Sequence, residues 1–289
     1  MNDQRAQFRD LLNRKQIITA PGAFDPLSAM VIEQSGFSAV YLTGGGMSRS
    51  YGFPDLGLMT MDENRAAIAR VCDAVAIPVI ADADTGYGNA LNVARTVREF
   101  ERTGVAAFHL EDQITPKRCG HYDGKEVVPI GEMIGKIKAA LDARRDERLT
   151  LIARTDSRAA LGLDRAIERG NLYAEAGADV VFVEAPRSIE ELKRIVNEIE
   201  APSMTNMIKG SRTPLLSPDE LEKIGFKIAI FPNDVHRAAI WAVRECVNHM
   251  RKFGTTETYD AMIDFDAREE IVGTAQWLAM AEKYADRES

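Results

Sequence analysis

Three acidic side chains end apolar runs of the sequence and together have the chemistry to hold a metal ion. Asp82 and Asp84 are two residues apart, so an extended strand would carry both on one face, and Glu111 ends the next apolar run along the chain. Carboxylates this close repel each other unless a cation lies between them. Oxygen ligands completed by water suit Mg²⁺, so these residues, with Asp55, predict a Mg²⁺ site that also accepts Mn²⁺. The alternative is that the acids cap loops or pair with Arg154.

Cys119 lies in the charged segment Pro116–His121, directly after the run that ends in Glu111. Cationic neighbours lower the pKa of a thiol, so this segment predicts a reactive cysteine. His121 is either part of that chemistry or a residue that orders the loop. Cys72 and Cys246 fall within apolar helical patterns and fit the ordinary role of small core residues.

Arg154 and a run of three glycines are candidates for binding a substrate carboxylate. Arg154 ends one apolar run, and Gly44–Gly46 follow another. Glycines let backbone N–H groups come close to an anion, although a plain tight turn would look the same. An arginine together with metal-binding acids favours the carboxylate site.

Eight short apolar runs alternate with longer stretches of helical periodicity. The predicted strands are Ile17–Pro21, Ala39–Thr43, Pro78–Asp82, Ala106–Glu111, Leu149–Arg154, Val180–Glu184, Ser203–Asn206 and Ile228–Pro232. The predicted helices include Thr60–Val75, Ala90–Thr103, Gly131–Arg145, Leu163–Ala176 and Ser188–Ile199, and Ser217–Glu220 has the residues of a helix start. This alternation predicts an α/β fold, a (β/α)₈ barrel of the TIM type, with the active site at the carboxyl ends of its strands.

One barrel of roughly 250 residues accounts for nearly all of the chain, so we expect a single domain over residues 1–289. An extra C-terminal helix is expected at Arg268–Tyr284, beyond the eighth unit. The extension 266–289 would then cover the barrel or pack on a neighbouring subunit.

Composition narrows the class of protein. The net charge of −8, without a basic tract, argues against nucleic-acid binding. No run approaches the roughly 18 apolar residues that span a bilayer, so no membrane partner is expected. Three widely spaced cysteines and a polar first segment favour free thiols and a cytoplasmic protein without a signal peptide.

Eight motifs in fixed order resemble the isocitrate lyase/phosphoenolpyruvate mutase superfamily over almost the whole chain. They are Val40–Gly46, Pro54–Thr60, Ala81–Val93, His109–Gln113, Pro116–His121, Ile152–Asp156, Val181–Pro186 and Thr213–Ser217. The cysteine in Pro116–His121 makes the chain look like the lyase branch, which includes 2-methylisocitrate and 2,3-dimethylmalate lyases.

The resemblance implies a Mg²⁺-dependent carbon–carbon lyase that cleaves a 2-hydroxy-2-methyl di- or tricarboxylate to pyruvate and either succinate or propionate. Cys119 would be the acid and Tyr41 a candidate base, with His121 and Glu111 also catalytic. Asp82 and Asp84 would contact the metal directly or through water, and Asp55 and Glu111 would lie behind them. The residues implied in substrate binding are Tyr41, Thr43, Gly44, Gly45, Gly120, Arg154, Glu184, Asn206, Arg237 and Arg268. The resemblance also implies a homo-oligomer, a tetramer whose dimers exchange a C-terminal helix.

The substrate remains open at this stage. Methylisocitrate lyases commonly have serine where Thr43 stands, and the segment Tyr122–Lys125 is closer to the dimethylmalate type. Arg237 and Arg268, however, fall where methylisocitrate lyases hold a further carboxylate. Two other readings compete: an oxaloacetate hydrolase or decarboxylase or a phosphonopyruvate-type P–C bond enzyme on the same barrel, and a metabolite-binding protein with an inactive site.

Overall fold

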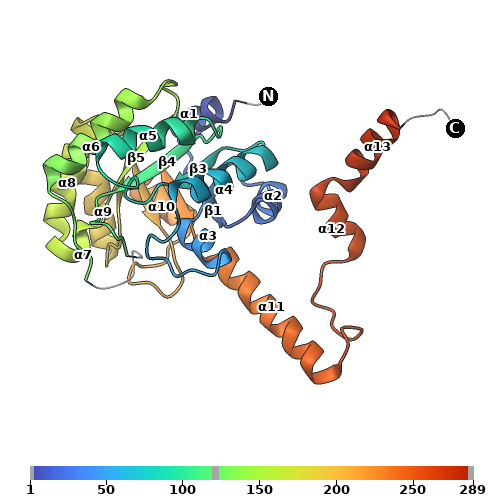
Figure 1. The fold of residues 1–289 in the computed structure, drawn as a ribbon. Helices are drawn as coiled ribbons and strands as arrows, with labels where there is room; N and C mark the ends of the chain where they lie inside the picture. The colour runs from blue at the N-terminus through green and yellow to red at the C-terminus, as the bar shows by residue number, and fades with distance from the viewer. Residues whose placement is uncertain (1–2, 119–123, 286–289) are drawn as a thin grey trace. The chain divides into compact units, whose positions relative to one another are not determined.

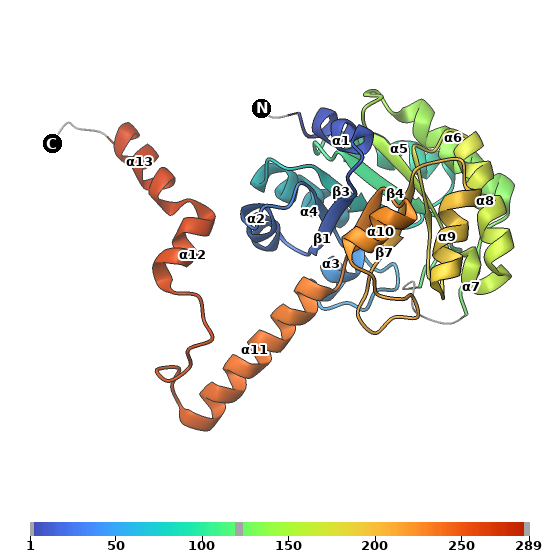
Figure 2. The same cartoon turned by 180° about the vertical axis from the view of Figure 1, so that it is seen from behind.

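Eight parallel strands close into a barrel in the computed structural model, which describes residues 3–118 and 124–285 (Figures 1 and 2). The strands pair in sequence order, and β1 closes the barrel against β8. Their bounds are β1 Ile18–Ala23, β2 Val40–Leu42, β3 Val79–Asp82, β4 Ala107–Glu111, β5 Thr150–Thr155, β6 Val180–Val183, β7 Ser203–Asn206 and β8 Ile228–Phe231. All eight predicted strands are therefore present, and the predicted (β/α)₈ barrel is confirmed.

Helices follow the strands and surround the barrel (Figure 1). They are α2 Pro26–Gln34, α4 Met61–Ala74, α5 Ala90–Glu101, α6 Ile130–Ala143, α8 Leu163–Glu175, α9 Ile189–Glu198 and α10 Pro218–Ile224, with α1 Gln4–Asn13, α3 Gly44–Ser50 and α7 Ser157–Leu161 in addition. Helix α10 starts as predicted, because the Ser217 side chain accepts from the Glu220 N–H while the Glu220 carboxylate accepts from Ser217. Helix α11, Asp234–Phe253, follows β8.

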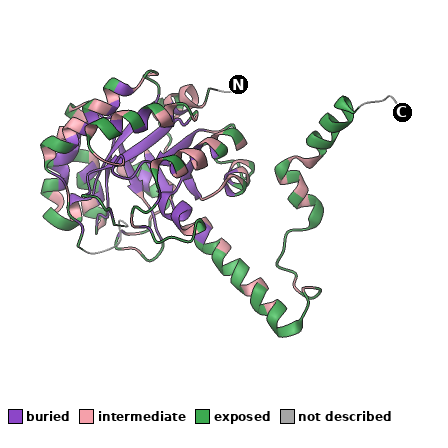
Figure 3. Ribbon diagram, in the orientation of Figure 1, coloured by how far each residue is buried: buried purple, intermediate pink, exposed green. Residues whose placement is uncertain are grey.

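The core of the barrel has two parts. Alternate strand residues such as Ile80, Ile152 and Phe182 fill the interior of the barrel. The residues between them, such as Ala81 and Val181, pack outward against the helices. Nearly all strand residues are buried and the outer helix faces are exposed (Figure 3). Because both faces of each strand are buried, only the polar groups at the strand ends are available for chemistry.

The chain divides into two compact units, Met1–His236 and Arg237–Ser289. The second unit contains most of α11 and two further helices, α12 Phe265–Val272 and α13 Thr274–Tyr284. The single helix expected at Arg268–Tyr284 is thus two helices, because Gly273 between them has a left-handed φ of 70° and ends α12. In the described part of the chain, no helix combines the length and apolar character needed to cross a bilayer.

Candidate active site

The carboxyl ends of the barrel strands enclose a small polar cavity. Its volume is about 40 Å³, which is space for a few water molecules, whereas pockets for drug-sized ligands measure roughly 300–1,000 Å³. The described residues that line it are Tyr41, Thr43, Gly45, Asp55, Asp82, Lys117, Arg154, Glu184, Asn206, Ile208, Pro232 and Asn233. Side chains at this rim must therefore move before a molecule larger than a few waters can enter.

The Lys117 ammonium lies between two of the acids that the sequence predicted for the metal. Lys117 Nζ donates to Asp55 in a short contact and lies 2.8 Å from Asp84 Oδ1. The lysine is buried, with 6% of its surface exposed. Burial lowers the pKa of Lys117, but Asp84 and Asp55 outweigh it and hold that pKa well above the ordinary value. In this structure, the Lys117 ammonium supplies the positive charge that the acidic cluster requires.

The geometry of the acids differs from the predicted pair on one strand face. Strand β3 ends at Asp82, and Asp84 lies beyond it with a left-handed φ of 46°. The turn brings the Asp84 N–H to Asp82 Oδ1 at 2.9 Å, so the main chain, rather than strand alternation, sets the spacing. Among residues 3–118 and 124–285, no three His, Cys, Asp or Glu side chains are close enough together to hold a metal ion as they stand.

These acids nevertheless fit a hard divalent cation in their chemistry. Asp55, Asp82, Asp84 and Glu111 offer carboxylate oxygens only, and all four are buried. Apart from its 2.8 Å ion pair with Lys117, Asp84 Oδ1 accepts no hydrogen bond from a described residue. Burial also raises the pKa of Glu111 well above its ordinary range, so this carboxylate needs further positive charge to ionise fully.

Tyr41 and His109 form a buried pair beside Asp82. Tyr41 Oη and His109 Nε2 are 2.8 Å apart, and Tyr41 Oη also lies 3.5 Å from Asp82 Oδ2. Burial, followed by the Asp82 charge, raises the pKa of Tyr41 well above 10. Burial, followed by Arg154, lowers the pKa of His109 to about 3. Both rings are therefore neutral near pH 7, and Tyr41 is arranged as a hydrogen-bond donor. A role as base would require it to lose a proton beside a carboxylate.

Arg154 lies at the centre of a buried ion-pair network. Its guanidinium binds Asp156 through two N–H groups at 2.8 and 3.1 Å, and it lies 3.3 Å from Glu111 and 3.6 Å from Glu184. Lys125 Nζ contacts the same Asp156 carboxylate at 2.8 Å. Burial alone would raise the pKa of Asp156, but Arg154 and Lys125 lower it below its usual range. The ionised Asp156 carboxylate thus holds the Arg154 guanidinium in place at the rim.

The predicted glycine cradle is the start of a helix rather than a turn. Gly44–Gly46 form the first residues of α3, and the Thr43 hydroxyl accepts from the Gly46 N–H at 3.3 Å. A Cβ at Gly44 would lie 2.5 Å from Asp82 Oδ2, so only glycine allows this close approach. Thr43 and Gly45 both line the cavity, where their polar groups are available to a carboxylate.

The structure brings together most, but not all, of the predicted site residues. Asn206 ends β7 and lines the same cavity as Arg154; its Nδ2 donates to Glu184 at 3.4 Å, and its buried Oδ1 has no hydrogen bond to a described residue. Cys119, Gly120 and His121 lie outside the described residues. Arg237 and Arg268 belong to the second unit and are not placed relative to the barrel.

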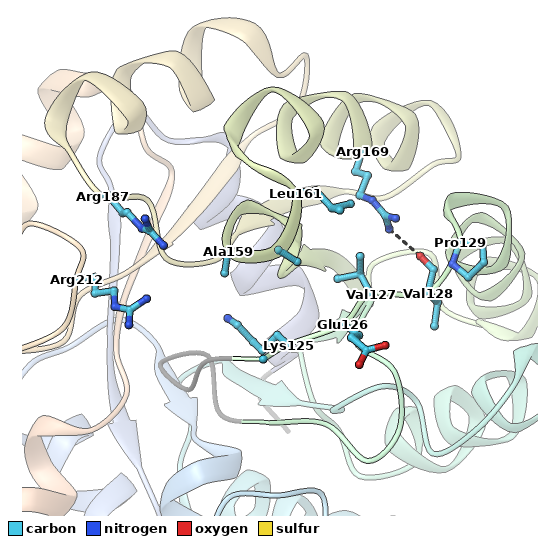
Figure 4. A pocket seen from close by; sticks show the side chains of 12 residues that line it. Lys125, Glu126, Val127, Val128, Pro129, Ala159, Leu161, Arg169, Arg187 and Arg212 are labelled. Atoms are coloured by element: carbon cyan, nitrogen blue, oxygen red, sulfur yellow. Dashed lines mark hydrogen bonds between the residues drawn. The ribbon is translucent and has the colours of Figure 1, made fainter.

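A larger cavity of about 640 Å³ lies next to this site (Figure 4). Figure 4 shows Lys125, Arg187 and Arg212 directed toward one end of it and the apolar side chains of Val127 and Leu161 at the other. It shares no described lining residue with the smaller cavity. The buried link from Lys125 through Asp156 to Arg154 separates the two.

A buried hub beneath the rim was not predicted from the sequence. Asp112 accepts hydrogen bonds from the Asp156 N–H and from the side chains of Thr155, Arg169 and Tyr173, at 2.9, 2.7, 3.0 and 2.8 Å. Asp112 follows Glu111 directly, so its place in an acidic strand end was the only available signal. Through Asp156, this hub positions Arg154.

Comparison with known proteins identifies the family of the chain. Residues 8–251 match the family model described as phosphoenolpyruvate phosphomutase. The chain therefore belongs to the phosphoenolpyruvate mutase/isocitrate lyase superfamily. Its curated relatives place it with the carbon–carbon lyases of that superfamily.

Two relatives and two solved structures illustrate the similarity. The chain is 46% identical to 2,3-dimethylmalate lyase of Eubacterium barkeri, over 97% of this chain and 98% of that one. It is 42% identical to 2-methylisocitrate lyase of Aeropyrum pernix, over 86% and 80%. A structure of oxaloacetate acetylhydrolase with 3,3-difluorooxalacetate superposes with a TM-score of 0.93 at 35% identity, over 99% of both chains. Phosphonopyruvate hydrolase, solved with oxalate and Mg²⁺, gives a TM-score of 0.89 at 32% identity, over 97% of this chain and 99% of that one.

Proposed function

We propose that this protein is a Mg²⁺-dependent lyase that cleaves the C2–C3 bond of a 2-hydroxy-2-methyl dicarboxylate or tricarboxylate and releases pyruvate. The observation that carries the proposal is the cavity at the strand ends, which is lined both by the acids Asp55 and Asp82 and by the anchored Arg154. Acids that suit a metal and an arginine that suits a carboxylate are the two groups that a 2-hydroxy acid needs.

Binding begins with the carboxylate end of the substrate. Arg154 donates two parallel N–H bonds to the C1 carboxylate, and Thr43, Gly45 and the Asn206 amide bind the remaining oxygens. A bound Mg²⁺ would hold the C2 hydroxyl and the adjacent carboxylate and withdraw electron density from both. Tyr41 donates a hydrogen bond to the same oxygens and fixes their orientation.

Cleavage then requires one proton to leave and another to arrive. Loss of the C2 hydroxyl proton to a base forms the pyruvate carbonyl as the C2–C3 bond breaks, and the bonding electrons pass to the other fragment as an enediolate. Cys119 donates its thiol proton to C3, which gives propionate from a dicarboxylate or succinate from a tricarboxylate. Among the described groups, the acids near Asp82 suit the role of base better than Tyr41, because the pKa of Tyr41 is raised.

The dicarboxylate is the favoured substrate. The segment Tyr122–Lys125 has the dimethylmalate type of sequence, and the relative from Eubacterium barkeri carries that activity in its name. Arg237 and Arg268 are the groups that would favour a tricarboxylate.

Product analysis across a substrate panel tests the proposal: pyruvate is measured for every substrate, with glyoxylate in addition for isocitrate, and oxalate and acetate for oxaloacetate. The panel is 2,3-dimethylmalate, 2-methylisocitrate, isocitrate, oxaloacetate and phosphonopyruvate, each with Mg²⁺ and with excess chelator. We expect metal-dependent pyruvate from the first, with at least about tenfold lower kcat/KM for the second. Faster turnover of oxaloacetate or phosphonopyruvate would favour the hydrolase reading, which the oxaloacetate acetylhydrolase likeness supports. Binding of metal and pyruvate without turnover of any substrate would indicate a metabolite-binding protein.

We also infer a homo-oligomer, with a tetramer as the expected state. Helices α11 to α13 carry many exposed apolar side chains, among them Trp241, Val247, Phe265, Trp277 and Leu278. Such a surface is costly in water and typical of subunit contacts. Light scattering coupled to gel filtration should give four times the mass of the 31.9 kDa chain, and removal of residues 237–289 should lower it.

A further inference from the structure

Lys117 lies among the acids that would hold the proposed metal. Its ammonium contacts Asp55 and Asp84, which come from two different segments of the rim, and its own side chain is 6% exposed. The lysine stem lies beside Gly57, where a Cβ would be in ordinary van der Waals contact with Lys117 Cγ at 3.4 Å. Lys117 is therefore held inside the rim rather than on the surface of the protein.

The position of Lys117 explains two other observations. The cavity is only about 40 Å³ although its walls carry several predicted substrate contacts, Thr43, Arg154 and Asn206 among them, and Lys117 is one of its lining residues. The acids also form no metal-binding group among the described residues, because Asp55 and Asp84 are oriented toward the ammonium. Both observations follow if a protein cation takes the place of an external one.

A second contact ties the same segment to the acids. Gln113 Nε2 donates to Glu111 at 3.0 Å and to the Arg118 carbonyl at 2.9 Å, while the Arg118 N–H donates to Gln113 Oε1 at 3.0 Å. The main chain next to Lys117 therefore depends on the orientation of Glu111. A change in the charge around the acids would act on this segment at two points.

We propose that the Lys117 ammonium competes with the divalent cation for the Asp55 and Asp84 carboxylates. Lys117 is then a positioning residue that weakens metal binding and links the arrival of the metal to the position of residues 113–118. The physical reason is that like charges repel strongly at these separations in a buried site, so the ammonium and the metal cannot both approach the same oxygens closely. The inference rests on the proposed metal dependence.

Metal affinity measured without substrate tests the proposal. Mn²⁺ binding is followed by electron paramagnetic resonance and Mg²⁺ binding by calorimetry, on the full-length wild type and on Lys117→Met, Lys117→Gln and Lys117→Arg. We expect both neutral variants to bind either ion at least about tenfold more tightly than the wild type, and Lys117→Arg to stay within about threefold. The thermal midpoint of Lys117→Met should also rise more on addition of Mg²⁺ than that of the wild type.

Lys125→Met is the matched control. It removes the same charge from a buried lysine of the same segment, but from a pair with Asp156. Its metal affinity should change by less than about threefold.

Each result bears on the proposal. Neutral variants of Lys117 that bind metal no more tightly than the wild type would overturn the inference and leave the metal dependence standing. No metal binding by any protein, the wild type included, would overturn both. If Lys117→Met folds only when Mg²⁺ is present, the competition is supported, and if it does not fold at all, Lys117→Gln decides.

Discussion

Replacement of Asp112 by asparagine is expected to destabilise the barrel by disrupting the hub under Arg154. In the native hub, Oδ2 accepts from Thr155, Arg169 and Tyr173, and Oδ1 accepts from the Asp156 N–H. Asparagine has one acceptor oxygen and one NH₂ group. In either orientation of the amide, its NH₂ group faces donors: the Asp156 N–H on one side, or Thr155, Arg169 and Tyr173 on the other. The buried Arg169 also loses its counter-charge.

The magnitude follows from the loss of one partner of a buried ion pair, which typically costs about 3–5 kcal/mol. Asp112 is fully buried and Arg169 is 5% exposed, so water cannot replace the lost contacts. We expect Asp112→Asn to lower the free energy of unfolding by about 3 kcal/mol. At roughly 2–4 °C per kcal/mol for a chain of this size, the thermal midpoint falls by about 6–12 °C.

Urea unfolding followed by far-ultraviolet circular dichroism measures the change, with a thermal melt alongside. Glu198→Gln is the control, because it breaks a surface pair with Arg194 and should leave the midpoint unchanged. A loss of less than about 1 kcal/mol for Asp112→Asn would refute the reasoning and show that Asp112 does not stabilise the hub as an ionised acceptor.

Four further predictions concern the site. Arg154→Lys should lower kcat/KM by at least about tenfold, because lysine cannot form the bidentate pair, and an unchanged value would remove Arg154 from substrate binding. Cys119→Ser should lower kcat by about 10²–10⁴-fold with an unchanged melt; near-native kcat would exclude it as the acid. In alkylation, Cys119 should react before Cys72, whose pKa burial raises to about 12. The pKa of His109 is about 3 in the folded protein and about 6.5 in the unfolded chain. Between these pH values the unfolded state binds a proton that the folded state does not. The free energy of unfolding therefore falls as the pH is lowered from 6.5 to 3, by up to about 1.4 kcal/mol per pH unit. In urea titrations from pH 4 to 7, His109→Gln should therefore show a smaller pH dependence than the wild type; equal slopes would contradict this.

The barrel was predictable because the causes of its elements are local. Strand β6, Val180–Val183, is a continuous apolar run, and α10 begins at a serine–proline pair with acids in the first turn. Such signals need no knowledge of the rest of the chain. Helix α3 shows the limit: three glycines disfavour a helix, and only the Thr43 cap and the packing of Gly44 against Asp82 decide otherwise.

The site was predictable in its residue types but not in its contacts. Lys117 was expected to act on its sequence neighbour Cys119, whereas its described partners include Asp55, 62 residues away. Asp112 and Arg169 are 57 residues apart. Pairings over such distances depend on the barrel, which brings the strand ends to one rim, so sequence spacing alone does not specify them.

The two anchors on either side of residues 119–123 have a consequence for how such enzymes diversify. On one side Lys117 is held by Asp55 and Asp84, and on the other Lys125 is held by Asp156. Both anchors belong to the rim of the barrel, so the residues between them can change while their points of attachment stay the same. Exchange of residues 119–123 for those of a homologue is then expected to change the substrate while the strands of the barrel stay as they are.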